Sequence, residues 1–501
     1  MSTTENAAAV SDIALRFMKT FEIPGVAVAV VSAQGWTLAR GHGVRRLGAP
    51  AAVGADTVFA AGSTSKAFLS ACLAILVDEG RLGWDDRVAD HLPEFAMSDP
   101  VVTEMMTIRD LLVHRSGLPL GAGDLMQFPP TDHSPAEVMQ ALRHFKLARG
   151  FRTGYAYDNT LYLVAGMLLE RVTGMSWDQF VNTRIFVPLD MSDAVSHPSL
   201  ITTDNRAARH ARLGPPTIGM GPLELIEPAE SPLIGPAGGV SVSAAGILPW
   251  LQVQLGRGRM GSGARLWSEA RADEMWAPHT IVSSGPGPSA EAPQRSVMQG
   301  YALGWGVSDY RSRRMLSHGG ALAGQASRVT LLPDHGIGLA ILSNSGETEV
   351  VSGLRYALID HLLGVSGFDW LSATATSIAR LHAQVHGMGD LGSTPPEGGP
   401  TLALEAYAGR YRDPWYGDLL ITLSGGVLSV DFTRTPAFKS ALEPFGPDSF
   451  RTRFARGAGE DAVMSFGVDD GRVARLTLRA LSPIADFSFD FHDLAFEPVR
   501  E

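Results

Sequence analysis

Ser63-Thr64-Ser65-Lys66 is the stretch whose residue types and spacing point most directly to chemistry. Ser63 and Lys66 are three residues apart, so one helical turn places the hydroxyl and the amine on one face. That amine can take the proton of the hydroxyl during nucleophilic attack if burial or neighbouring charge keeps it neutral. A helix start also offers free backbone N–H groups where negative charge would develop. Taken alone, the pattern also fits an N-cap serine followed by a solvated lysine, so it needs support from other motifs.

Apolar residues at helical spacing predict that this motif opens a helix over residues 63–79. Gly80 stands where a C-terminal cap is expected. Ser63 and Lys66 lie off the apolar stripe, at the start of the helix. Cys72, the single cysteine, lies on the stripe, which favours a core residue over a nucleophile, and it has no internal disulfide partner.

Two further motifs follow in the chain. Tyr157 and Asn159 are two residues apart just before a predicted helix, so in an extended backbone both side chains project to one side and Asp158 to the other. The alternative is a core tyrosine followed by an asparagine that caps the helix. His318-Gly319-Gly320 is predicted to lie on an edge strand, where the glycines let a substrate approach the backbone closely. The alternative for His318 is a buried, hydrogen-bonded histidine.

These motifs and their neighbours resemble the serine β-lactamase-related family of the class C type, which includes class C β-lactamases, D-aminopeptidases, DD-peptidases and esterases. The resemblance spans roughly residues 10–365. Six ordered segments carry it, and they specify the fold and the mechanism but leave the substrate open. The segments are residues 63–66, 107–119, 151–168, 236–240, 301–306 and 317–320.

The resemblance implies a role for each motif residue. Ser63 would be the nucleophile and Lys66 its base, while Tyr157 would relay a proton to the leaving group. Asn159 would orient Lys66 or bind a substrate carbonyl. The backbone N–H groups of Ser63 and Ala321 would form the oxyanion hole, beside Gly319 and Gly320.

Position 318 departs from the β-lactamase pattern. β-Lactamases usually have lysine there, whereas many peptidase and esterase relatives have histidine. A fixed cation that would pair with a β-lactam carboxylate is therefore missing, and we expect penicillins and cephalosporins to be poor substrates.

Composition is that of a folded enzyme. Apolar residues make up 45% and charged residues 19% of the 501 residues, which excludes a wholly disordered chain. The net charge of −11 disfavours nucleic acid and anionic membranes as partners. Histidines and the cysteine show no metal-ligand spacing, so we expect neither a metal nor another cofactor. The first residues carry no basic and apolar leader pattern, which predicts a cytoplasmic enzyme.

The order of elements predicts two folded parts. Strand patterns near residues 23–41 and again at 302–343, with helix-rich sequence at about 84–295 between them, predict an antiparallel sheet flanked by helices. This is the α/β plus all-α fold that the resemblance implies, over residues 1–385. A Gly/Pro-rich linker is expected at 386–402.

Residues 403–501 are predicted to form a small antiparallel β-barrel, similar to the lipocalin-like extension of some relatives. Strands are expected at residues 409–412, 419–423, 427–432, 450–454, 462–468, 473–478 and 486–491. We expect this barrel to wall the cleft and restrict substrates, or to hold an oligomer together. Tyr411, Trp415 and Tyr416 are the candidates for reaching the site, with plugging the barrel end as the alternative.

The sequence therefore predicts a cofactor-free serine hydrolase that forms an acyl-enzyme on small peptides. A carboxylesterase or a β-lactamase is the alternative activity. A ligand-sensing binding protein on the same fold is the alternative without catalysis. Small peptides or esters are the expected partners, and a homo-oligomer is compatible with the sequence.

Overall fold

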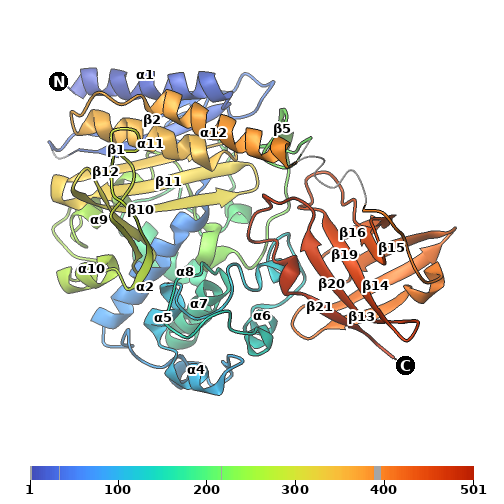
Figure 1. The fold of residues 1–501 in the computed structure, drawn as a ribbon. Helices are drawn as coiled ribbons and strands as arrows, with labels where there is room; N and C mark the ends of the chain where they lie inside the picture. The colour runs from blue at the N-terminus through green and yellow to red at the C-terminus, as the bar shows by residue number, and fades with distance from the viewer. Residues whose placement is uncertain (1–2, 33, 216, 389–395, 501) are drawn as a thin grey trace.

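The fold consists of a helix-and-sheet part and a β-barrel packed against it, the latter drawn in orange and red in Figure 1. The structure is a computed structural model that describes residues 3–32, 34–215, 217–388 and 396–500. Within these residues, no helix is both long and apolar enough to cross a membrane.

An antiparallel eight-stranded sheet organises the first part, and it joins strands from the two ends of that part of the chain. Its order is β2-β1-β12-β11-β10-β9-β8-β7. The strands are β1 (Gly25–Val31), β2 (Thr37–Gly43), β7 (Thr280–Ser284), β8 (Met298–Tyr301), β9 (Gly306–Tyr310), β10 (Arg313–Leu322), β11 (Gln325–Leu332) and β12 (Ile337–Ser343). The sheet confirms the predicted fold, while β7 and β8 are strands that the sequence patterns did not reveal.

Helices cover both faces of this sheet (Figure 1). In β1, Val26, Val28 and Val30 join the core beneath α1 (Thr3–Phe21), α11 (Thr348–Leu362) and α12 (Trp370–Gly387). Ala27 and Ala29 face the opposite core, which contains α2 (Lys66–Asp78). Because both faces are covered, β1 is apolar throughout instead of alternating. The helices α1 and α12 were not predicted.

The segment between the two halves of the sheet consists of short helices joined by long loops. It contains α3 (Val88–His91), α4 (Pro100–Met105), α5 (Ile108–Leu112), α6 (Pro135–Ala141), α7 (Thr160–Thr173), α8 (Trp177–Val181), α9 (Leu248–Leu255) and α10 (Glu269–Trp276). Two short strand pairs accompany them, β3 (Phe59–Ala60) with β6 (Ser241–Val242) and β4 (Arg209–Arg212) with β5 (Leu223–Ile226). Helix α2 lies centrally and is buried on all sides from Lys66 to Leu76, so the expected apolar stripe is only part of its buried surface.

The C-terminal part is a nearly closed antiparallel barrel of order β16-β15-β14-β13-β21-β20-β19-β18-β17. Its strands are β13 (Gly409–Asp413), β14 (Gly417–Ser424), β15 (Val427–Phe432), β16 (Lys439–Ala441), β17 (Glu443–Pro444), β18 (Ser449–Arg451), β19 (Ala462–Asp469), β20 (Arg472–Ala480) and β21 (Ala495–Pro498). Part of the linker expected at 386–402 falls on residues 389–395, which lie outside the described residues.

The strand predicted at residues 486–491 was wrong. The alternation of Phe487, Phe489 and Phe491 suggested a strand, but the segment is a loop ending in a short 3-10 turn, Phe491–Asp493. The Asp486 carboxylate accepts a hydrogen bond from the Ser488 backbone N–H, and Phe489 N–H donates to the Asp486 carbonyl. These local bonds form a turn that competes with strand pairing.

The barrel contacts the first part at several points. Trp415 packs on Phe145 with ring centroids 4.6 Å apart, and Arg434 pairs with Asp132 and Glu137. The Thr217 hydroxyl donates to Ser482 at 2.7 Å. The apolar cores of the two parts are continuous across this contact.

Candidate active site

Ser63 is the exposed hydroxyl in a turn whose other members are buried. The 3-10 turn Gly62–Ser65 leads directly into α2, and Ser63 is partly exposed while Thr64 and Ser65 are buried. Thr64 Oγ1 donates to the Ala61 carbonyl, and Ser65 Oγ donates to the Gly62 carbonyl and accepts from Val240 N–H. Their hydroxyls are therefore used within the fold, which leaves that of Ser63 to face the cleft.

Lys66 lies beneath Ser63 and has no exposed surface. Its Nζ donates to Ser63 Oγ at 3.1 Å, to Asn159 Oδ1 at 2.7 Å and to the Ala237 carbonyl at 2.8 Å. Burial lowers the pKa of Lys66 to about 7, against the opposing influence of Asp124 and Asp158. Near neutral pH the amine is therefore available both as a proton acceptor and as a donor.

Tyr157 and Asn159 both approach the same amine from the loop before α7, although Asn159 has a helical backbone and not the extended one that the argument from the two-residue spacing assumed. The Tyr157 hydroxyl is hydrogen-bonded to Ser63, and the Lys66 Nζ lies 4.8 Å from the centre of the Tyr157 ring. Burial raises the pKa of Tyr157 well above its ordinary value, so the hydroxyl keeps its proton. Asp158 points elsewhere and accepts from Leu161 N–H, so this carboxylate, and not Asn159, caps α7.

The third motif lies on β10, which is an inner strand and not the edge strand expected from the sequence. Pairing with β9 runs from Arg313 to Ser317, so it ends just before His318. From there the strand lies against the Ser63 turn. A Cβ on Gly320 would fall 1.9 Å from the Ala61 carbonyl oxygen, and one on Gly62 would fall 2.8 Å from Ala321 N. The close approach of the two backbones therefore requires glycine at both positions.

His318 is buried and carries no positive charge. Its Nε2 is 2.8 Å from the Tyr301 hydroxyl, and its Nδ1 is 2.7 Å from the Gly319 carbonyl oxygen. The carbonyl can only accept, so this pattern assigns the proton to Nδ1 and leaves Nε2 to accept from Tyr301. Burial and the neighbouring Lys66 lower the pKa of His318 to about 3.

Asp124 is a member of this cluster that the sequence analysis missed. It has no exposed surface, and its Oδ2 accepts from Asn159 Nδ2 at 2.9 Å. Burial raises the pKa of Asp124 to about 7. The nearby Gly121 and Gly123, both with positive φ, mark a tight turn in the sequence and were the only local signal for this segment.

Residues of the barrel reach the site, but they are not the predicted ones. Phe487 lies edge-on to Tyr157 with ring centroids 5.6 Å apart, and Ser488 Oγ donates to Asp124 Oδ2 at 2.8 Å. Trp415 packs on Phe145, while the Tyr411 hydroxyl donates to the Tyr407 carbonyl inside the barrel. Tyr416 is hydrogen-bonded to Thr435, also within the barrel.

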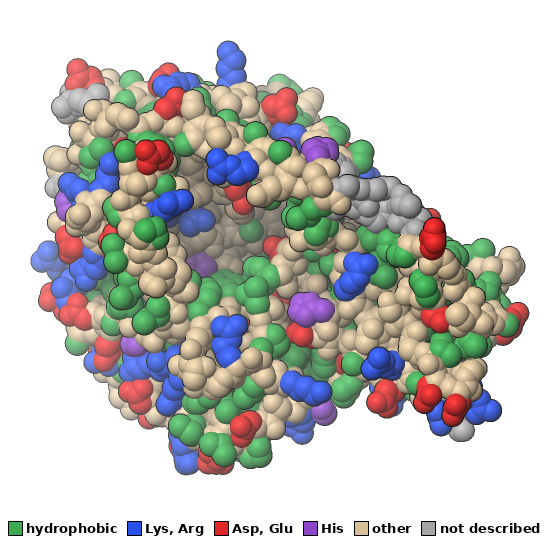
Figure 2. Space-filling model, viewed as in Figure 1, with side chains coloured by type: hydrophobic (Ala, Val, Ile, Leu, Met, Phe, Trp, Pro, Cys, Tyr) green, Lys and Arg blue, Asp and Glu red, His purple; other side chains and the backbone are tan. Residues whose placement is uncertain are grey.

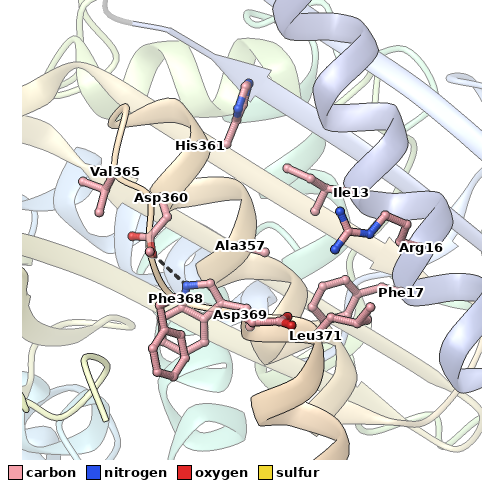
Figure 3. A pocket seen from close by; sticks show the side chains of 12 residues that line it. Ile13, Arg16, Phe17, Ala357, Asp360, His361, Val365, Phe368, Asp369 and Leu371 are labelled. Atoms are coloured by element: carbon pink, nitrogen blue, oxygen red, sulfur yellow. Dashed lines mark hydrogen bonds between the residues drawn. The ribbon is translucent and has the colours of Figure 1, made fainter. Parts of the chain in front are cut away.

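On the face shown in Figure 2, the surface is hollowed between the sheet and the helices below it. A separate cavity of about 500 Å³ lies between α1 and the α11–α12 segment, on the other side of the sheet (Figure 3). Arg16, Asp360 and Asp369 line that cavity together with apolar side chains. It contains none of the motif residues.

Comparison with known proteins is decisive for the family. Residues 10–363 match the β-lactamase family, and residues 393–498 match a family described as a domain of unknown function (DUF3471). The chain belongs to the β-lactamase family.

Relatives of this β-lactamase-family chain include hydrolases and penicillin-binding proteins. The unguisins hydrolase ungD of Aspergillus violaceofuscus is 28% identical and covers 84% of this chain and 77% of its own. Penicillin-binding protein 4 of Amycolatopsis lactamdurans is 31% identical over 68% of this chain and 87% of its own. The octameric penicillin-binding protein homologue from Pyrococcus abyssi shares the fold over 97% of this chain and 98% of its own, with a TM-score of 0.61 and 18% identity. The chain is thus a serine hydrolase by family, as the sequence resemblance indicated.

Proposed function

We propose that this serine hydrolase cleaves amide bonds of small peptides through an acyl-enzyme on Ser63. The observation that carries the proposal is the buried Lys66 amine, 3.1 Å from Ser63 Oγ, with its pKa lowered to about 7. A lysine in this state accepts a proton at neutral pH, which an exposed lysine rarely does.

The reaction would proceed in two halves. Ser63 Oγ attacks the substrate carbonyl carbon as its proton passes to the Lys66 amine. The carbon–nitrogen bond then breaks, and the leaving amine takes a proton that Tyr157 delivers from the Lys66 side. Water attacks the resulting Ser63 ester, releases the acid and restores the hydroxyl. Tyr157 suits a relay because its raised pKa keeps it a neutral donor and acceptor.

The remaining motif residues would hold the substrate. The backbone N–H groups of Ser63 and Ala321 are the proposed oxyanion donors, and donors of this kind lower the barrier by several kcal/mol. Because the pairing of β10 with β9 ends at Ser317, the backbone of β10 at Gly319 and Gly320 would be available to a peptide backbone, and Asn159 would orient Lys66.

The neutral His318 favours peptides or esters over β-lactams. Both ring nitrogens are engaged within the protein, so His318 offers no fixed charge to a β-lactam carboxylate. The relative ungD is named a hydrolase of unguisins, and that name is compatible with the proposed preference for peptides or esters over β-lactams. A carboxylesterase remains the alternative activity, since ester cleavage uses the same groups.

A fluorophosphonate probe followed by a substrate panel tests the proposal. Mass spectrometry should find the adduct on Ser63 in the wild type and no adduct in Ser63→Ala. An adduct on Ser65 or Cys72 would contradict the assignment. Peptide, p-nitrophenyl ester and β-lactam substrates, each with Ser63→Ala as the blank, then separate the activities. A ligand-sensing protein would bind members of the panel without forming an adduct or a product.

A further inference from the structure

A chain of buried polar groups runs from Ser63 into the barrel. Lys66 donates to Asn159 Oδ1 at 2.7 Å, and Asn159 Nδ2 donates to Asp124 Oδ2 at 2.9 Å. The same Asp124 oxygen accepts from Ser488 Oγ at 2.8 Å. Ser488 belongs to the barrel, 364 residues from Asp124 in sequence.

The geometry at Asn159 shows why Asp124 matters. An amide side chain can rotate so that its oxygen and nitrogen exchange places. Asp124 Oδ2 can only accept when ionised, so it selects the orientation in which Asn159 directs its nitrogen to Asp124 and its oxygen to Lys66. Without that acceptor, the amide loses one of the two contacts that fix its orientation, and only the bond from Lys66 is left to hold it.

The barrel in turn fixes Asp124. The Asp490 carboxylate accepts from Gly123 N–H at 2.9 Å and from Leu125 N–H at 3.1 Å, on either side of Asp124. Gly121 has positive φ, and a Cβ there would fall 2.6 Å from the Phe487 carbonyl oxygen. The turn that carries Asp124 is therefore built to receive the loop of the barrel, and Asp490 and Asp124 are both fully buried.

We propose that Asp124 is a positioning residue for Lys66, acting through Asn159, and that Ser488 and Asp490 of the barrel hold Asp124 in place. The inference rests on the proposed role of Lys66 as the base for Ser63. On this inference the barrel contributes to acylation itself, in addition to forming a wall of the cleft.

Two serines of the same barrel segment provide a matched pair of variants. Both make a hydrogen bond across the contact, Ser488 to Asp124 and Ser482 to Thr217. Ser488→Ala should lower the single-turnover acylation rate with a p-nitrophenyl ester about tenfold, as expected for one lost bond to a charged group. Ser482→Ala should leave the rate unchanged, and Ser488→Thr, which keeps the hydroxyl, should restore most of it.

The direction in which the pH profile of acylation moves separates the proposed role from a loosened fold. Burial is the main cause of the lowered pKa of Lys66, so hydration of a loosened site would move the midpoint to higher pH. Asp124 raises the pKa of Lys66, so Asp124→Asn should shift the midpoint of the rising limb to lower pH. The other titratable groups around the amine are Asp158 from the same loop as Tyr157, His114 after α5, His318 on β10, and Tyr157 and Tyr162. All of them are retained in the Asp124→Asn variant.

Two results would overturn the inference while leaving the proposed function intact. One is a wild type that acylates at Ser63 and a Ser488→Ala rate equal to that of Ser482→Ala. The other is an Asp124→Asn profile whose midpoint does not move. A wild type that forms no adduct at Ser63 would overturn the proposed function and this inference together.

Discussion

The acylation rate should rise with pH through a midpoint near 7, because the base must be the neutral form of Lys66. An ordinary lysine has a pKa of 10.5, so about 0.03% of it is neutral at pH 7. With the pKa lowered to about 7, half of Lys66 is neutral at that pH, roughly a 1,500-fold gain. Between pH 5 and pH 9 the neutral fraction climbs from about 1% to about 99%, so the rate should rise about 100-fold.

The acylation rate rises with pH because the group that loses its proton, Lys66, is the base. Tyr157 keeps its proton throughout this range because its pKa is raised, and His318 is neutral because its pKa is about 3. Lys66 and Asp124 are the described members of this cluster whose pKa lies at about 7, and of the two only Lys66 contacts Ser63. A rising limb that persists in Asp124→Asn therefore belongs to Lys66.

Single-turnover acylation by a p-nitrophenyl ester, measured from pH 5 to 9 with Ser63→Ala as the hydrolysis blank, provides the assay. Lys66→Arg is the companion variant, since guanidinium does not lose its proton in a protein. It should acylate very slowly and without the limb near pH 7. A wild-type rate that is flat over this range, or a midpoint close to 10, would refute the reasoning.

Three further outcomes are expected. Tyr157→Phe should lower the acylation rate by about 10² or more, and combining it with Lys66→Ala should add little, because both groups serve one proton path; a normal single-turnover rate in Tyr157→Phe would make this tyrosine structural. Cephalosporins should be hydrolysed poorly compared with short peptides, as steady-state kinetics would show, and efficient cephalosporin turnover would contradict the role given to the neutral His318. Phe487→Ala should raise the ratio of large-peptide to small-ester turnover, since the ring lies edge-on to Tyr157; Phe489→Ala, which removes a ring packed against Phe491 within the barrel, is the control and should leave the ratio unchanged.

The sequence was sufficient for the parts of the site that depend on short spacings. The three-residue step from Ser63 to Lys66 is set by helix geometry, and it brings the hydroxyl and the amine together. Tyr157 and Asn159, two residues apart, both approach the Lys66 amine, although Asn159 has a helical and not an extended backbone. The buried strands of the sheet were equally predictable, because runs such as Gly25–Val31 have a composition typical of such strands, whereas β7 and β8 were not.

The contacts that depend on docking were not predictable from the sequence. Asp124 follows two glycines in a loop, and nothing in its neighbourhood indicates that its partners are Asn159 and Ser488. The alternating phenylalanines Phe487, Phe489 and Phe491 suggested a strand, because alternation is the pattern expected of a half-buried strand. They pack against the barrel interior and against Tyr157, and this pairing is decided by how the two parts of the chain meet.

The Asp490 contact has a consequence for the order of events during synthesis. Asp490 supplies the acceptors for the backbone of Gly123 and Leu125, and 490 minus 124 is 366 residues of chain. At about 5–20 residues per second, a ribosome needs roughly 20–70 seconds to cover that stretch. During that time the nascent chain already contains Ser63, Lys66 and Tyr157, but the turn that carries Asp124 still lacks its final support. Maturation of the catalytic centre would therefore be among the last steps of folding, and a chain interrupted before the barrel would remain an immature hydrolase.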